Sequence, residues 1–213
     1  MKTTTKIIER VCPRCQKVFK TKAYDILNIN LNLEMKPKVL NGSIFDFKCA
    51  NCGALFRNPY SIVYEDMKKK YIIFLNMEDK NYDKKIEKLE ELYPEYKIRI
   101  VSDMMDLIEK IYIFEVKLND KIITYLSYKI YQDVTRKLLD MKSPIKISKV
   151  LFDSFNPSKN QVNFGALNNF QKRIFISATY TDYKTLQNSL KYMQCFKENL
   201  GEYKIDQNWA RRI

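Results

Sequence analysis

The chain has 213 residues, a formal net charge of +13 and 46% hydrophobic residues, which is ordinary for a folded protein of one large or two modest domains. It contains no histidine, which excludes Ser-His-Asp and Cys-His catalysis and the histidine-containing zinc sites of hydrolases and deaminases. The four glycines are too scattered to form a phosphate-binding loop or a dinucleotide fingerprint: Gly42, Gly53, Gly165 and Gly201.

The first ten residues have no long apolar segment and no small-residue cleavage site, so we expect no signal peptide. No run reaches the roughly 18 apolar residues of a membrane span, so we expect no membrane partner. The protein is therefore expected in the cytoplasm, where thiols stay reduced. Basic residues outnumber acidic ones in residues 1–70 and 141–213, but they are scattered lysines and few arginines, which is more typical of a solvated surface than of a binding patch.

A short internal repeat marks the N-terminal part. Residues 12–20 and residues 49–57 both read Cys-x-x-Cys, two spacers, an aliphatic residue, Phe and a basic residue. We call each Cys-x-x-Cys loop a knuckle. Two copies of one tight loop, each followed by an apolar strand start, predict a two-knuckle metal site with approximate twofold symmetry.

The segments around the second knuckle predict short strands. Residues 24–33 alternate apolar and polar side chains as a strand does. Residues 37–42 favour one helical turn, with proline near its start and glycine just past its end. Residues 44–47 then begin a strand that leads to Cys49. After the knuckle, residues 60–64 and 71–75 predict a hairpin that turns at the lysine cluster of residues 68–70.

Three helices are predicted in the middle of the chain. The charged stretch of residues 78–97 contains one short helix that Pro94 ends. Ser102 caps a second helix, whose apolar residues recur at helical spacing up to Tyr112. Asn119 or Asp120 caps a third helix, with one apolar face that extends to Leu138.

Strands return in the last third of the chain, at residues 150–152, 161–164 and 173–177. A helix is expected from Thr181 or Asp182 to about Phe196, followed by a final strand at residues 203–206. The fold class is therefore α+β: a zinc-ribbon-like antiparallel β region with two knuckles, a helical pair, and a small α+β C-terminal extension. We expect two domains, residues 1–140 and residues 141–213.

The paired spacing of four cysteines predicts one zinc ion. Each knuckle supplies two thiolates, and two knuckles complete the tetrahedron that zinc prefers: Cys12, Cys15, Cys49 and Cys52. A single iron with the same ligands, a thioredoxin-like redox pair and four unliganded core thiols are the alternatives. With four protein ligands no position is left for water or substrate, so the site should be structural. Cys195 lies apart and is expected to be a small core residue.

The residues beside the knuckles also carry expectations. Gly53 follows the second pair, where a positive φ lets an amide point at sulfur, and Gln16 holds the same place in the first knuckle. The negative charge of a four-thiolate centre should be partly offset by the neighbouring cations Lys17, Lys20, Lys48 and Arg57.

These motifs resemble the CpXC domain family, named for its paired Cys-Pro-x-Cys motifs. The resemblance is carried by Val11–Cys15 with Phe19, residues 40–45, Cys49–Gly53 with Phe56, residues 64–71 and residues 99–111, and more weakly by Trp209-Ala210. It covers roughly residues 8–135, and Ala50 stands where the family pattern has proline. The resemblance implies metal binding by the four cysteines and defines no catalytic residue.

Three functions are then open. The first is a zinc-stabilised adaptor that acts through protein partners, with an exposed apolar patch beside the helices. The second is nucleic-acid binding, with aromatic residues such as Phe56, Tyr60 and Tyr64 stacking on bases unless they form the small core. The third is an enzyme, which is the least expected, because the acidic groups are better explained as a turn at residues 65–66 and a solvated helix face: Asp103, Asp106 and Glu109.

Overall fold

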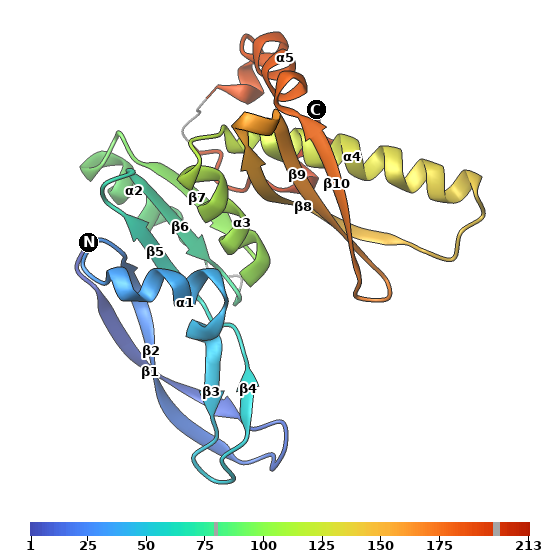
Figure 1. Cartoon of the computed structure of the whole chain (residues 1–213). Coiled ribbons are helices and arrows are strands. Elements are labelled where there is room, and N and C mark those ends of the chain that lie inside the picture. The colour runs from blue at the N-terminus through green and yellow to red at the C-terminus, as the bar shows by residue number, and fades with distance from the viewer. Residues whose placement is uncertain (79–80, 198–200) are drawn as a thin grey trace. The chain divides into compact units, whose positions relative to one another are not determined.

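The computed structural model describes residues 1–78, 81–197 and 201–213 (Figure 1). It is a mixed α+β protein that divides into two compact units, Met1–Ile108 and Glu109–Ile213. The units part earlier in the chain than the expected domain boundary after residue 140, and that boundary stays a prediction about independently folding domains. Among the described residues, no helix has the length and apolar character needed to cross a membrane.

The described residues of the first unit form seven strands, two α-helices and the start of a third. The strands are β1 (Thr4–Val11), β2 (Val18–Asn28), β3 (Asp46–Lys48), β4 (Leu55–Arg57), β5 (Ile62–Asp66), β6 (Tyr71–Leu75) and β7 (Lys97–Val101). The helices are α1 (Lys36–Leu40), α2 (Asp83–Leu92) and α3 (Met104–Glu115), the last of which continues into the second unit.

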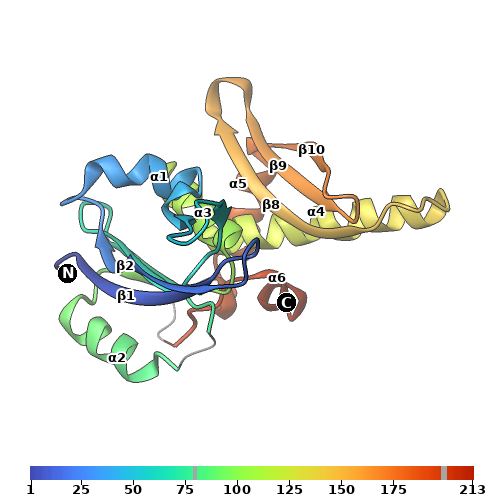
Figure 2. The same cartoon turned by 90° about the horizontal axis from the view of Figure 1, so that it is seen from below.

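A five-stranded mixed sheet holds the core of the first unit. Its order is β1-β2-β5-β6-β7, with parallel pairing between β2 and β5 and between β6 and β7. Figure 2 shows α1 on one side of this sheet and α2 on the other. Every residue of β5 and β6 is buried, as is typical of central strands covered on both faces.

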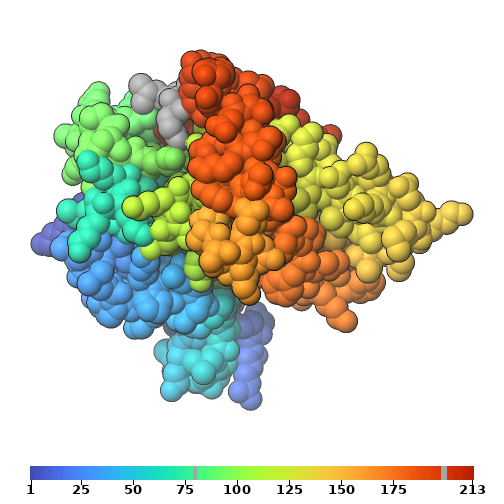
Figure 3. Space-filling model, turned by 45° about the horizontal axis from the view of Figure 1, so that its top comes forward, coloured from blue at the N-terminus to red at the C-terminus, as the bar shows by residue number. Residues whose placement is uncertain are grey.

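The β1–β2 hairpin continues beyond this sheet to the first knuckle. The short strands β3 and β4 form a separate two-stranded sheet that carries the second knuckle. Figure 3 shows the two hairpin ends, in blue and cyan, projecting from the rest of the first unit. We call this projecting part, residues 11–20 and 46–57, the knuckle end. It contains few buried side chains, because β3 and β4 are only three residues long each.

The second unit contains the helix α4 (Asp120–Asp140), the strands β8 (Ile147–Asn156), β9 (Gln161–Asn168) and β10 (Arg173–Thr179), and the helices α5 (Tyr180–Leu190) and α6 (Gln207–Arg211). The strands form an antiparallel sheet in the order β10-β9-β8, and α4 packs against β8. The inner face of β9 is fully buried through Val162, Phe164 and Ala166.

Most of the predicted elements exist, but several differ in detail. The hairpin at the lysine cluster, the helical turn after Pro37, the helix before Pro94, the Asn119 cap and the three late strands are confirmed. The strand predicted at residues 24–33 begins earlier and ends at Asn28. The strand predicted from residue 44 begins at Asp46, after a single 3-10 turn.

Several expectations about the elements were wrong. Residues 203–206 form no strand, because Asp206 instead caps α6 by accepting a hydrogen bond from the amide of Trp209 at 2.8 Å. Thr179, and not Thr181 or Asp182, caps α5 through a reciprocal pair with Asp182, and α5 ends at Leu190. The knuckle hairpins are antiparallel as expected, but the main sheet is mixed.

Candidate metal centre

The four cysteines lie at the ends of two antiparallel hairpins. Val11 pairs with Val18 at the end of β1 and β2, and the six residues between them form the loop that contains Cys12 and Cys15. Lys48 pairs with Leu55 at the end of β3 and β4, around the loop that contains Cys49 and Cys52. The sequence repeat is therefore a repeat of one hairpin.

The two knuckles share the same backbone hydrogen bonds. In the first, the amide of Cys12 donates to Lys17 O at 3.1 Å and the amide of Gln16 donates to Cys12 O at 2.9 Å. In the second, the amide of Cys49 donates to Ala54 O and the amide of Gly53 donates to Cys49 O, both at 2.9 Å.

The residue after the second cysteine of each pair is left-handed, with φ of 58° at Gln16 and 70° at Gly53. The expected equivalence of these two positions is confirmed. Glycine adopts this conformation without a steric penalty, whereas glutamine does not. The two loops therefore have one shape at different conformational cost.

The sulfur atoms form one compact cluster. The Sγ atoms of Cys12 and Cys52 are 3.6 Å apart, those of Cys15 and Cys49 are 3.7 Å apart, and all four lie within 4.8 Å of one another. These separations are far longer than a disulfide bond of about 2.05 Å. A tetrahedral centre with metal–sulfur bonds of about 2.3 Å would place its sulfurs about 3.8 Å apart, so the cluster fits a metal ion.

Electrostatics at the cluster also favour a cation. Burial raises the pKa of the Cys49 thiol, but hydrogen bonds from the backbone amides of Cys52 and Asn51 and from neighbouring thiols lower that pKa to about 6. The amide of Ala54 lowers the pKa of Cys52, but burial and the three neighbouring thiols together raise it to about 11. Four thiolates at these separations require a positive charge between them.

Two of the four cations expected near the sulfurs form ion pairs with carboxylates. The guanidinium of Arg57 donates to both carboxylate oxygens of Asp46, at 2.6 and 2.9 Å. Lys20 lies 3.7 Å from Glu9 across the first hairpin. Carboxylates on the paired strands lie opposite Arg57 and Lys20 and already neutralise part of their charge, and their contribution to the charge balance of the centre stays a prediction.

The aromatic residues behind the knuckles join the two hairpins. Phe19 and Phe56, which occupy equivalent places in the repeat, meet edge to face at 6.2 Å. Phe47 contacts Phe56 and Tyr60, and the guanidinium of Arg10 lies over the rings of Phe47 and Tyr60 at 5.5 and 5.7 Å. These rings form the small core of the knuckle end.

The model of the family described as CpXC protein matches residues 11–127, which is more than half of the chain and includes all four cysteines. The chain belongs to the CpXC family. Neither a curated protein nor a solved structure matches it.

The CpXC match ends within α4, so β8, β9 and β10 lie outside it. Within the match, the second motif carries Ala50 in place of the proline of the first. Because the hydrogen bonds of the two knuckles are the same, this departure leaves the loop geometry unchanged.

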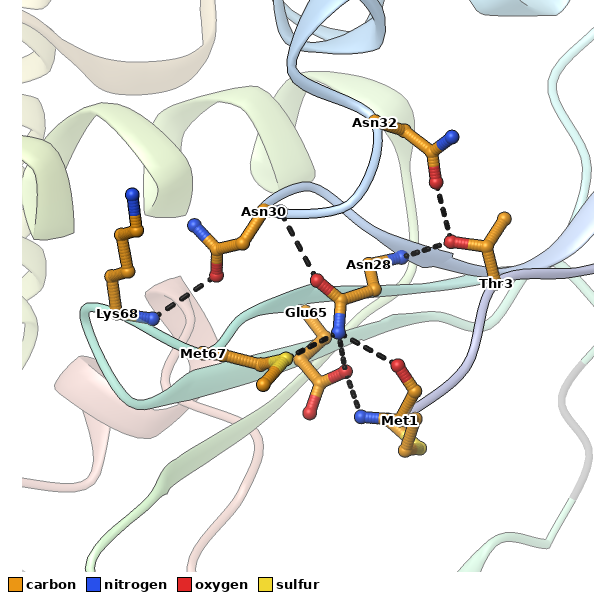
Figure 4. A network of polar contacts seen from close by, with 8 residues as sticks. All are labelled: Met1, Thr3, Asn28, Asn30, Asn32, Glu65, Met67 and Lys68. Carbon is orange, nitrogen blue, oxygen red and sulfur yellow. Dashed lines mark hydrogen bonds and ion pairs between the residues drawn. The ribbon is translucent and has the colours of Figure 1, made fainter.

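A second polar cluster in the CpXC region escaped the sequence analysis (Figure 4). Glu65 is fully buried at the end of β5, where its Oε2 accepts from the side-chain amide of Asn28 at 2.8 Å and pairs with the amine of Met1. The same Asn28 amide donates to Met1 O, and Thr3 and Asn32 extend the network. The cluster joins the ends of β2 and β5 to the start of β1.

The acidic groups were therefore misjudged from the sequence. Glu65 and Asp66 are buried residues of β5 and not a turn, because the turn begins one residue later. Asp106 and Glu109 are buried and not on a solvated helix face, and Glu109 accepts a hydrogen bond from the amide of Phe152 at 2.6 Å. The local sequence around such a carboxylate does not show whether its side chain is buried or exposed.

Proposed function

We propose that this CpXC protein binds one structural zinc ion through Cys12, Cys15, Cys49 and Cys52, in a zinc-ribbon-like arrangement of two knuckled hairpins. The observation that carries the proposal is the pair of Sγ separations, 3.6 and 3.7 Å, close to those of a tetrahedral four-sulfur centre. A bound zinc ion supplies a cross-link between the hairpins. The four cysteines fill the coordination sphere, so we assign the ion no part in catalysis.

Metal analysis tests this proposal. Protein purified from a host supplied with both zinc and iron should contain one zinc per chain. A single iron in the same four sulfurs is the chemical rival, because the ligand set suits both metals. Iron, or no metal after purification without chelator, would overturn the zinc assignment.

We further propose that the protein acts as an interaction module in the cytoplasm. Each knuckle hairpin carries an exposed aliphatic residue next to its loop: Val18 is 59% exposed on the first hairpin and Leu55 is 77% exposed on the second. Exposed apolar side chains on a projecting, metal-held element favour binding to a protein partner. These residues lie on the knuckle end, whereas the sequence analysis expected the patch beside the helices.

The adaptor proposal is tested by Leu55→Lys. This variant should keep its metal and its fold, because the side chain is exposed, and should lose a partner that co-purifies with the wild-type protein. The matched control is Leu92→Lys, which introduces the same charge at an exposed leucine at the end of α2. Equal recovery of the partner with both variants would contradict a role for the knuckle end.

Nucleic-acid binding is the second candidate. It is favoured by the exposed cations Arg14 and Lys17 at the end of the first knuckle and by the net charge of +13. Tyr60 and Tyr64 are buried, so they form core contacts and are not available to stack on bases. A mobility-shift assay over a salt series tests this candidate, and an absence of binding at low salt would eliminate it.

A further inference from the structure

The three-stranded sheet of the second unit has two very different edges. At β8 the pairing with β9 shifts register twice, between Ile147 and Lys149 and between Phe152 and Ser154. Helix α4 packs against β8, and the carboxylate of Glu109 accepts the amide of Phe152. Bulges, a covering helix and a side-chain acceptor are devices that prevent further strand pairing, so this edge is protected.

The β10 edge has no bulge, contacts only the helix α5 that directly follows it in the chain, and meets a side-chain acceptor at Thr179 alone among the described residues. All seven residues of β10 pair with β9 in regular register, from Arg173 to Thr179. Apart from Thr179, whose amide donates to Asp182, no main-chain group of β10 bonds to a side chain or loop in the part of the chain that is described. In an antiparallel ladder, alternate residues direct both main-chain groups away from the partner, so β10 offers a free row of donors and acceptors.

No charged side chain within residues 174–178 opposes further strand pairing at this edge. Residues 174–178 carry no charged side chain, no proline and no glycine. The guanidinium of Arg173 is directed back across the sheet: it lies 3.0 Å from Asp153 on β8 and passes over Gly165 on β9. A Cβ at Gly165 would lie 1.9 Å from Nε of Arg173, so the glycine makes room for this crossing.

The apolar side chains on the inner face of β10 are also incompletely covered. Ile174, Ile176 and Ala178 lie opposite the fully buried Ala166, Phe164 and Val162, yet they are only half-buried themselves. On the other face, Phe175 is 70% exposed. A strand added beside β10 would complete both the hydrogen-bond ladder and the inner apolar row.

We propose that β10 is a self-association edge, at which two copies of this chain pair antiparallel about a twofold axis at Ile176. In that register, Ile174 faces Ala178 of the second copy, Phe175 faces Ser177, and Arg173 faces Thr179. Apolar residues then meet apolar residues on the inner face, the large ring meets a small side chain on the outer face, and no like charges are opposed.

Closure favours a second copy over an unrelated strand. An antiparallel pair of β10 strands is isologous, so a single contact pairs the open β10 edges of both copies. The resulting six-stranded sheet would end at β8 on each side, where the edge is already protected. The assembly therefore stops at two copies and leaves no unprotected edge of this sheet.

Sedimentation of the full metal-loaded chain tests the proposal. The wild-type protein should approach twice its monomer mass of 25.5 kDa as its concentration rises. Ser177→Lys places a lysine on each copy opposite Phe175 and should weaken the dimer about tenfold, because a symmetric interface receives each change twice. Phe170→Lys is the matched control: it adds the same charge at an exposed residue in the turn before β10, and its dissociation constant should equal that of the wild type.

Amide hydrogen exchange locates the interface. The alternate amides of β10 that point away from β9 should exchange slowly in the dimer and fast after dilution or in Ser177→Lys. A wild-type protein that stays monomeric at its highest soluble concentration would overturn the proposal. So would a dimer that Ser177→Lys leaves intact, or a dimer whose outward β10 amides exchange as fast as those of the monomer.

Discussion

The knuckle end and the β5–β6 centre belong to the same compact unit but are held in different ways. Every residue of β5 and β6 is buried, whereas β3 and β4 have three residues each and mostly exposed side chains. The centre is stabilised by apolar burial, which needs no ligand. The knuckle end has one small aromatic cluster and four sulfurs, so most of its stability should come from a bound metal. We therefore expect one chain to combine a ligand-independent core with a ligand-dependent extension.

Removal of one cysteine ligand should produce the largest difference in stability between the knuckle end and the β5–β6 centre. Cys49→Ser should lose the metal and with it a binding free energy on the order of 10 kcal/mol, which is folding free energy for the knuckle end. Amide exchange should become fast in residues 11–20 and 46–57 and stay slow in β5 and β6. Cys195→Ser is the control, because this half-buried thiol lies outside the cluster and should leave metal content unchanged. Simultaneous loss of protection in β5 and β6 would contradict the comparison.

The reciprocal change acts on the centre. Ile73→Ala removes buried methyl groups from β6 and should lower the free energy of unfolding by about 2–5 kcal/mol. Metal affinity under native conditions should not change, because Ile73 lies on β6 between Tyr64 of β5 and Arg99 of β7 and belongs to neither knuckle hairpin. Urea unfolding of the metal-saturated protein measures the first effect and chelator competition the second. Ile7→Ala, at a largely exposed position on β1, should cost less than about 0.5 kcal/mol.

Acid should weaken metal binding before it weakens the centre. The pKa of Cys49 is lowered to about 6, so this thiol is largely ionised at pH 7, whereas the pKa of Cys52 is raised to about 11 and its proton must leave when metal binds. Binding at pH 7 should therefore release protons, and the apparent affinity should fall about tenfold per pH unit for each thiol that is protonated. Below pH 6 the slope should steepen, because Cys49 then also competes with a proton.

Calorimetry in buffers of different ionisation enthalpy counts the released protons. An affinity that does not change between pH 8 and pH 5 would show that the sulfurs are not the ligands.

The smallest effect compares the two knuckles with each other. Gly53→Ala should weaken the second knuckle by about 1 kcal/mol, because alanine resists the left-handed conformation, while the nearest atom to its Cβ would be Lys48 Cε at 4.0 Å. Gln16→Gly should strengthen the first knuckle by a similar amount. Gly201→Ala, also at positive φ but outside the two knuckles, should leave metal affinity unchanged. Metal titration with a competing chelator measures all three, and a tighter complex in Gly53→Ala would refute the equivalence of the loops.

The candidate site was predictable from the sequence because its evidence is local. Two Cys-x-x-Cys pairs followed by Phe at the same distance already define the repeated hairpin, and Gly53 marks the left-handed turn. The geometry adds what spacing cannot: the cross-knuckle sulfur distances and the Phe19–Phe56 contact. The ion pair of Arg57 with Asp46 was not predicted, because the two residues become neighbours only through the pairing of β3 and β4.

The fold was less predictable where distant segments meet. The strands β1 and β7 were missed. Strand β1 is mostly exposed and polar, and β7 has only five residues, which closely follow a charged helix and its terminating Pro94. The parallel pairings of β2 with β5 and of β6 with β7 join segments that no local pattern connects. Glu65 was taken for a turn residue because its burial depends on Asn28, which lies on another strand.

X-ray absorption at the metal edge tests the central claim most directly, because it reports both the identity of the metal and the atoms bound to it. The account predicts zinc surrounded by four sulfur atoms at about 2.3 Å in the wild-type protein, with that signal absent in Cys49→Ser. Oxygen or nitrogen in the first shell, fewer than four sulfurs, or an iron edge in place of zinc would contradict it.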